Sequence, residues 1–203
     1  MEALQQVTGV AAPLLRINID TDQIIPTIFL GGTDAKGYGA HLFHWWRFRP
    51  DGQPDPDFIL NQPPYDHAQI LLADRNFGCG SSRERAPKAL REFGFRAILA
   101  PSFGGIFYNN CWRNGMVPVE LPIAQIRQIA DEVAARQGRA SVTVDLQALC
   151  VQTAGGLHFA FEAPATLRDM LLQGVDEIAL TLGRQDEIAA FRQRDRLLRP
   201  WAY

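Results

Sequence analysis

The feature that most constrains the fold is an alternation of buried strands and helices in the middle of the chain. Residues 68–73 (AQILLA) and 97–100 (AILA) are short, continuous apolar runs, and helical patterns follow them over residues 83–93 and 103–113. Continuous apolar runs of this length are typical of strands that are buried on both faces of a sheet. Strand, helix, strand and helix at this spacing predict a parallel βαβ unit.

The flanking segments extend this unit into a mixed sheet. Residues 141–146, 150–153 and 157–161 alternate apolar and polar side chains, which predicts an antiparallel meander. The other predicted elements are a strand within residues 7–19 and helices over residues 122–137, 165–173 and 185–198. We therefore expect one α/β domain over residues 1–203, with a C-terminal helical extension at about residues 185–203.

Composition excludes several classes of partner. Of the 203 residues, 47% are hydrophobic and 21% are charged, and the formal net charge is −2, which gives no electrostatic reason to expect nucleic acid or an anionic membrane. No run approaches the roughly 20 apolar residues that span a bilayer. Three cysteines lie far apart, and the first residues do not resemble a secretory signal. These features predict a reduced protein of the cytoplasm.

The segment with the most chemical character is NFGCGSSRE, residues 76–84, between a predicted strand and a predicted helix. Its two glycines allow a sharp turn and a close approach to a ligand. Ser81 or Ser82 can cap the helix, whose N-terminus favours an anion. Arg83 adds a guanidinium fork that matches a carboxylate. The segment predicts a carboxylate-binding site that contains two hydroxyls.

Other interpretations of this segment differ in how well they fit. A phosphate-binding loop requires a Walker or GxGxxG pattern, and neither is present. A serine-hydrolase elbow requires a second glycine at position 83, where the chain has arginine. A capped loop that binds no ligand fits the segment taken alone, so it stays open beside the carboxylate site.

A series of blocks in fixed order is more specific than any one of them. These are DTDQIIP at 20–26, GYGAHLF at 37–43, the 76–84 segment with Ala86-Pro87, APSF at 100–103 and IFYNN at 106–110. Over essentially its whole length the chain resembles the small subunits of 3-isopropylmalate dehydratases, which are similar to the swivelling domain of aconitase. The resemblance implies a swivelling β/β/α domain with a mixed sheet. It also implies the small subunit of a hydro-lyase that interconverts 2- and 3-isopropylmalate in leucine biosynthesis.

The resemblance assigns roles to individual residues. It implies that Ser81 is the catalytic base that removes a proton from the substrate, and that Gly80, Ser82 and Arg83 bind the substrate carboxylate. A serine oxygen acts as a base only if hydrogen-bond donors and cations stabilise its negative charge. The block at residues 20–26 is expected to give structural support.

Three departures from the family pattern affect the substrate. The chain has Arg85 where relatives usually carry histidine, Lys88 where they often carry tryptophan, and Asp-Ala-Lys at 34–36 where they have a Thr-Arg-Thr-like run. An added cation at Arg85 and a lost one at Ala35 change how a second carboxylate or an alkyl group is received, and we expect Arg85 and Lys36 to contact substrate. The alternative substrate is a related 2-hydroxy diacid of the methylmalate or dimethylmalate type.

The predicted reaction also needs an electrophile to remove the hydroxyl group. The cysteines are not spaced as iron–sulfur ligands, and His41 and His44 do not form a zinc pattern. The resemblance implies that this chain binds no cofactor and that a separate large subunit carries a 4Fe–4S cluster. We therefore expect the large subunit and a small dicarboxylate as partners. Two alternatives are a non-catalytic assembly subunit and a standalone carboxylate-binding module.

Overall fold

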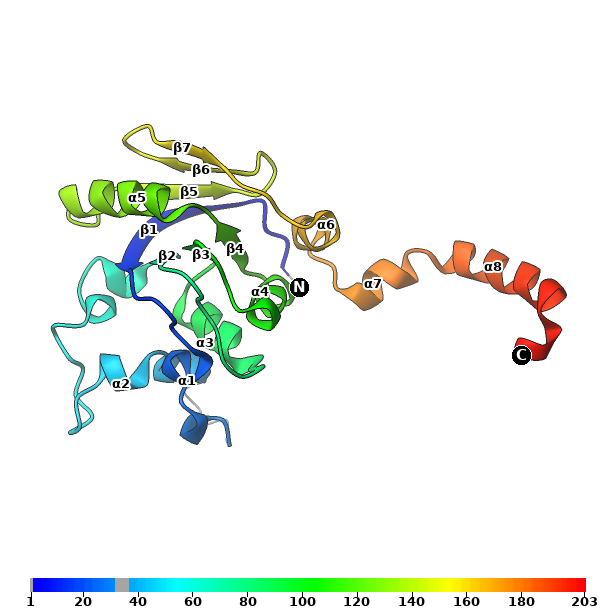
Figure 1. Cartoon of the computed structure of the whole chain (residues 1–203), viewed down its shortest axis with the longest axis horizontal. Coiled ribbons are helices and arrows are strands. Elements are labelled where there is room, and N and C mark those ends of the chain that lie inside the picture. The colour runs from blue at the N-terminus through cyan, green and yellow to red at the C-terminus, as the bar shows by residue number, and fades with distance from the viewer. Residues whose placement is uncertain (1, 32–36) are drawn as a thin grey trace.

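The computed structural model describes residues 2–31 and 37–203, and its centre is one mixed sheet (Figure 1). Over the described residues the sheet has seven strands in the order β4-β3-β2-β1-β5-β6-β7. Strands β1 to β4 pair in parallel, and β5 to β7 continue the sheet in antiparallel fashion. The strands are β1 (Gln6–Leu14), β2 (Ile70–Ala73), β3 (Ala97–Ala100), β4 (Val117–Glu120), β5 (Ser141–Asp145), β6 (Cys150–Thr153) and β7 (His158–Ala160). The predicted α/β class with a mixed sheet is confirmed.

Helices cover both faces of the parallel half of this sheet. The α-helices of the described residues are α1 (Thr21–Ile24), α2 (His44–Arg47), α3 (Arg85–Phe93), α4 (Gly105–Arg113), α5 (Ile123–Ala135), α6 (Ala165–Gln173), α7 (Glu177–Leu182) and α8 (Gln185–Leu198). Helices α3 to α6 contribute core residues on the two faces of the sheet. Single 3-10 turns lie at η1 (Thr27–Phe29), η2 (Tyr38–His41), η3 (Ile59–Asn61), η4 (Tyr65–His67) and η5 (Pro200–Ala202). None of the described helices is both long and apolar enough to cross a bilayer.

The core has two layers because side chains of a strand alternate between the two faces. Leu71 and Ala73 of β2 pack with α3, α4 and the segment before β2. Ile70 and Leu72 of the same strand pack on the other face with α5 and α6. Burial on both faces explains why β2 and β3 are apolar at every position.

Among the elements not predicted from the sequence are the short helices α1, α2 and α7 and the strand β4. Strand β4 begins Val-Pro-Val, with Pro118 at its second position. Because β4 is the edge strand of the sheet, a proline there is tolerated. Helix α7 is short, and its N-cap is Asp176, whose carboxylate accepts the backbone N–H of Ala179 at 2.7 Å.

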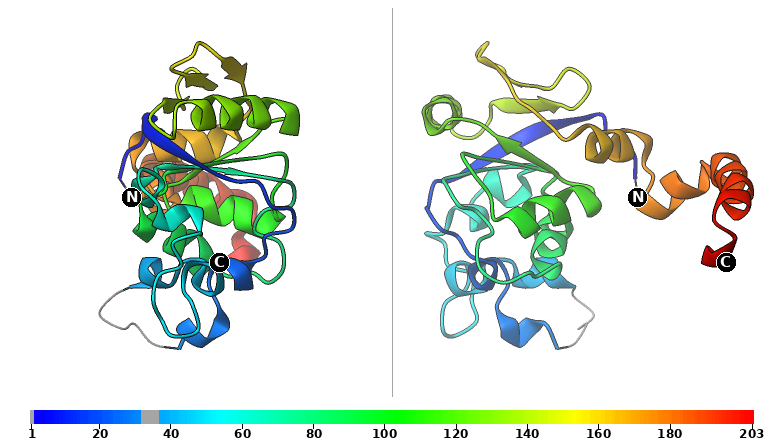
Figure 2. Two further views of the ribbon diagram at one scale, coloured as in Figure 1. Left: turned by 90° about the vertical axis from the view of Figure 1, so that its left-hand side faces the viewer. Right: turned by 45° about the vertical axis from the view of Figure 1, so that its right-hand side comes forward.

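The chain after α6 projects away from the sheet, as Figure 1 and the right-hand view of Figure 2 show. In α8 only Asp195 is buried, and it accepts hydrogen bonds from Arg199 and from the Tyr203 hydroxyl. We propose a single domain over residues 1–203, with a C-terminal helical extension at about residues 185–203.

Candidate active site

The candidate site lies where the segments that follow β1, β2 and β3 come together, at the carboxyl ends of parallel strands. Isolated β-bridges join Asp20 to Cys79 and Phe77 to Phe103. The N–H of Gly78 donates to the carbonyl of Ile19 at 2.7 Å, so the 76–84 segment is held by the segment after β1. Such carboxyl ends are the usual ligand-binding edge of an open α/β sheet.

Asn76 connects all three segments. Its backbone N–H donates to the Ser102 hydroxyl, and its side-chain amide donates to the Asn18 side chain, both at 2.9 Å. Asn76 has a φ of +61° and Asn18 a φ of +55°, a left-handed conformation that asparagine tolerates better than most residues. The polar side chains of these loops therefore fix the loops to one another.

Gly78 is required by both backbone conformation and packing. Its φ is +71°, and a Cβ atom at this position would lie 2.2 Å from the ring of Phe107, which is buried. The aromatic ring therefore occupies the volume that any other residue would need. The close approach of the loop to α4 depends on this glycine.

We expect Gly78→Ala to lower the free energy of unfolding by about 2–4 kcal/mol, because overpacking and a left-handed alanine both cost energy. Urea denaturation monitored by circular dichroism measures this change. Gly105→Ala is the matched control, since a Cβ there meets no atom within 4 Å and residue 105 lies at the start of α4. Equal stability of the two variants would contradict the packing argument.

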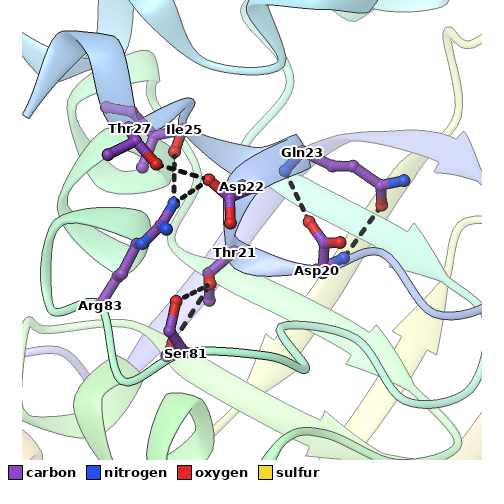
Figure 3. Close-up of polar contacts among 8 residues, drawn as sticks. All are labelled: Asp20, Thr21, Asp22, Gln23, Ile25, Thr27, Ser81 and Arg83. Atoms are coloured by element: carbon purple, nitrogen blue, oxygen red, sulfur yellow. Dashed lines mark hydrogen bonds and ion pairs between the residues drawn. The ribbon is translucent and has the colours of Figure 1, made fainter.

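Ser81 is fixed by helix α1, as Figure 3 shows. A capping box starts this helix: the Asp20 carboxylate accepts the N–H of Gln23 at 2.7 Å, and the Gln23 side chain accepts the N–H of Asp20 at 3.0 Å. The hydroxyl of Thr21, the next residue, donates to the Ser81 carbonyl at 3.1 Å and lies 3.4 Å from the Ser81 hydroxyl. Ser81 itself is exposed.

Arg83 is held by the other end of α1. Its Nη1 donates to the Asp22 carboxylate in a short contact and to the Ile25 carbonyl at 3.4 Å (Figure 3). The Arg83 guanidinium and the Thr27 hydroxyl hold the pKa of Asp22 below its usual value. Among the described residues, Arg83 bonds only through Nη1, so Nη2 and Nε can bind a second anion.

The prediction that Ser81 or Ser82 caps the helix is wrong. Helix α3 begins at Arg85, and its N-cap is Glu84, which has helical backbone angles and makes no side-chain cap bond. The two serines precede the helix in a turn, where the N–H of Arg83 donates to the Ser81 carbonyl at 2.8 Å. Contacts from α1 hold this turn, so the serine hydroxyls are not directed to the start of α3.

A cavity of about 400 Å³ lies beside this turn. Arg85 donates from Nε to the Tyr38 hydroxyl at 3.1 Å and makes no ion pair within the described residues. Lys88 pairs with Glu84 at 2.7 Å. The lining residues are Leu30, Tyr38, Ser82, Arg83, Glu84, Arg85 and Lys88. The described lining residues include three cations and one acid, so the cavity favours an anionic ligand.

The structure therefore brings together only some of the residues predicted from the sequence. Ser82, Arg83 and Arg85 line the cavity, whereas Gly80 and Ser81 are exposed next to them and are not among its lining residues. Lys36 lies outside the described residues. Thr21, Asp22 and Tyr38 were not predicted as site residues, because no sequence spacing relates positions 21 and 38 to positions 81 and 85.

The histidines and cysteines near the site have structural environments. The ring of His41 stacks on Phe29 at 4.0 Å between centroids. Cys79 is a free thiol whose pKa is raised by burial and by the nearby Asp20 carboxylate. In the described part of the chain, no three His, Cys, Asp or Glu side chains cluster in a way that could hold a metal ion.

Comparison with known proteins places this geometry in a family. Residues 1–124 match the family model of the aconitase C-terminal domain. A protein of Cupriavidus necator named 3-isopropylmalate dehydratase small subunit is 52% identical, over 100% of this chain and 99% of the relative. A protein of the same name from Paramagnetospirillum magneticum is 47% identical, over 99% of this chain and 100% of the relative.

A solved structure agrees with these relatives. The crystal structure of 3-isopropylmalate dehydratase from Methanocaldococcus jannaschii matches with a TM-score of 0.63 and 25% identity, over 92% of this chain and 99% of that one. The full-length identity to named relatives and the match to the domain family agree with the order of the sequence blocks. The chain belongs to the aconitase C-terminal domain family, among the small subunits of 3-isopropylmalate dehydratases.

Proposed function

We propose that the chain is the small subunit of a hydro-lyase that interconverts 2-isopropylmalate and 3-isopropylmalate in leucine biosynthesis, in the cytoplasm. One observation carries the proposal: an exposed serine hydroxyl at position 81 lies in the same turn as Ser82 and Arg83, which line a cationic cavity. The names of the full-length relatives support the same substrate.

In this proposal Ser81 moves a proton between two neighbouring carbon atoms of the substrate. Its alkoxide oxygen takes the proton as the C–H bond breaks, and the bonding electron pair forms the C=C bond while the hydroxyl group leaves. Rehydration in the opposite sense returns the proton to the adjacent carbon. The isomerisation is balanced, because Ser81 ends each cycle in the protonation state in which it began.

The cations around the turn are proposed to bind the two carboxylates of the substrate. Nη2 and Nε of Arg83 face one carboxylate while Nη1 stays on Asp22. Arg85, oriented by the Tyr38 hydroxyl, receives the second, and the Ser82 hydroxyl and the backbone at Gly80 complete the contacts. Lys36 is kept in the proposal as a further substrate contact. Of the described residues that line the cavity, Leu30 is the aliphatic one, so it is suited to contact the alkyl group.

The other half of the reaction is assigned to the large subunit. The described residues of this chain do not form a cluster of metal ligands, and the relatives are named as small subunits. We propose that the large subunit carries a 4Fe–4S cluster, which supplies the Lewis acidity that removal of the hydroxyl group requires. The complete active site then forms between the two chains.

We expect hydration and dehydration of isopropylmalate only when this chain is mixed with its large subunit. The formation of the unsaturated intermediate, followed by ultraviolet absorbance, measures the activity of each subunit alone and of the mixture. Methylmalate and dimethylmalate serve as competing substrates in the same assay. Higher kcat/KM for either of these diacids, or no activity in the mixture, would contradict the proposed function.

A further inference from the structure

Thr21 is the buried polar residue that contacts the proposed catalytic base. The residue is only 1% exposed, although its side chain carries a hydroxyl. Its backbone N–H donates to the Cys79 carbonyl at 3.0 Å, and its hydroxyl contacts both the carbonyl and the hydroxyl of Ser81. Buried polar groups normally form hydrogen bonds, and the buried Thr21 hydroxyl forms its contacts with Ser81, a residue of an exposed turn.

The number of protons decides the direction of these hydrogen bonds. A carbonyl oxygen only accepts, so the single proton of the Thr21 hydroxyl goes to the Ser81 carbonyl at 3.1 Å. In the 3.4 Å contact between the two hydroxyls, Ser81 must then be the donor. This second contact is longer than an ordinary O–H···O bond, so it holds the neutral hydroxyl weakly.

A deprotonated Ser81 reverses this arrangement. The negative oxygen has no proton to donate and is a stronger acceptor than a carbonyl oxygen. Rotation about the Cβ–Oγ1 bond of Thr21 can turn its proton from the carbonyl to the Ser81 oxygen. Water can replace the lost bond, because Ser81 is exposed.

Several charged groups close to Ser81 in the sequence are engaged with partners of their own. The carboxylates of Asp20 and Asp22 lie on either side of Thr21 in the sequence, but Asp20 accepts from the N–H of Gln23 and Asp22 is bound by Arg83. The pKa of Cys79 is raised, which favours a neutral thiol. Glu84 is paired with Lys88, and Arg85 is bound to Tyr38. Among the described residues, the Thr21 hydroxyl is the side-chain donor that contacts the Ser81 hydroxyl.

We propose that Thr21 is a positioning residue for Ser81. When the side-chain oxygen of Ser81 is negatively charged, the Thr21 hydroxyl turns away from the Ser81 carbonyl and donates its proton to that oxygen in a hydrogen bond. This inference rests on the proposed function, since it requires Ser81 to act as the base. It gives the block at residues 20–26 a part in the chemistry, beyond the structural support expected from its sequence.

The test compares variants of the full chain mixed with the large subunit. We expect Thr21→Val to lower kcat for isopropylmalate by about thirtyfold to a hundredfold with KM within about threefold of wild type, because a donor to a developing oxyanion is lost. Thr21→Ser keeps the hydroxyl and is expected to stay within about threefold of wild-type kcat. Thr8→Val is the matched control, since Thr8 forms an exposed hydroxyl pair with Thr143 on the sheet at 2.9 Å.

A second pair of variants guards against misfolding of Thr21→Val. Thr21→Ala and Thr21→Ser both lack the methyl group and differ only in the hydroxyl, so their ratio of kcat repeats the comparison. Wild-type kcat in Thr21→Val, equal loss in Thr21→Ser and Thr21→Ala, or a loss confined to KM would overturn the inference while the proposed function stands. An inactive wild-type mixture would contradict the proposed function and the role of Thr21 together.

Discussion

Replacement of Ser81 by alanine is expected to reduce kcat of the reconstituted enzyme by at least about a thousandfold, because removal of a catalytic base leaves only substrate binding and the partner's chemistry. Ser81 is exposed, and within the described part of the chain its hydroxyl has just the long 3.4 Å contact with Thr21, so the fold should not depend on it. Steady-state turnover of isopropylmalate measures the effect.

Ser141→Ala is the control for Ser81→Ala. Ser141 is also an exposed serine, but it lies at the start of β5, away from the carboxyl ends of the parallel strands. Both variants should unfold at the wild-type temperature and co-purify with the large subunit. Retention of a tenth or more of wild-type kcat by Ser81→Ala would show that another group removes the proton.

Replacement of Arg83 by glutamine is expected to lower kcat/KM by about a hundredfold to ten-thousandfold, with most of the change in KM. Loss of one partner of a buried or partly buried charge pair typically costs several kcal/mol of binding energy. The side chain of Arg83 is only 18% exposed, so the pairing with a substrate carboxylate is poorly screened by water. Initial rates over a range of isopropylmalate concentrations separate KM from kcat.

Two further variants distinguish substrate binding from support of the fold. Asp22→Asn removes the ionic partner of Arg83 but leaves the guanidinium in place, and it should cost no more than about tenfold in kcat/KM. Arg113→Gln breaks a comparable ion pair with Glu177, at 2.8 Å, far from the site and should leave kcat/KM unchanged. If Asp22→Asn were as impaired as Arg83→Gln, the main role of Arg83 would be to hold α1.

Much of the fold was predictable because local sequence and tertiary environment agree. The run Ala97–Ala100 is apolar throughout and is the strand β3, which is buried at every position. The helix predicted over residues 185–198 is α8 (Gln185–Leu198). No element was predicted over residues 117–120, where the structure has the strand β4. Pro118 is unfavourable in most strands, and the position of β4 at an edge of the sheet removes that penalty. A sequence alone does not state which strand is the edge.

The site was predictable in composition but not in geometry. The residues at 80–83 were identified from their chemical types, and Ser82 and Arg83 do line one cavity. The start of α3 was placed two residues too early, because serine is a common N-cap and the competing contacts from Thr21 and Asp22 are not local. Contacts between residues that are about 60 positions apart depend on the pairing of β1 with β2.

The site is formed by the three loops that follow β1, β2 and β3, so it can form only late in folding. Asn18, Asn76 and Ser102 are brought together only after β1, β2 and β3 have paired, and closing chain segments of this length has an entropic cost. A truncated chain that ended before β3 would contain every residue from Gly80 to Arg85 and would still lack the shape that these side chains need. The site can therefore bind a ligand only after the sheet has formed. Substitutions that weaken strand pairing can abolish activity although they lie far from the site.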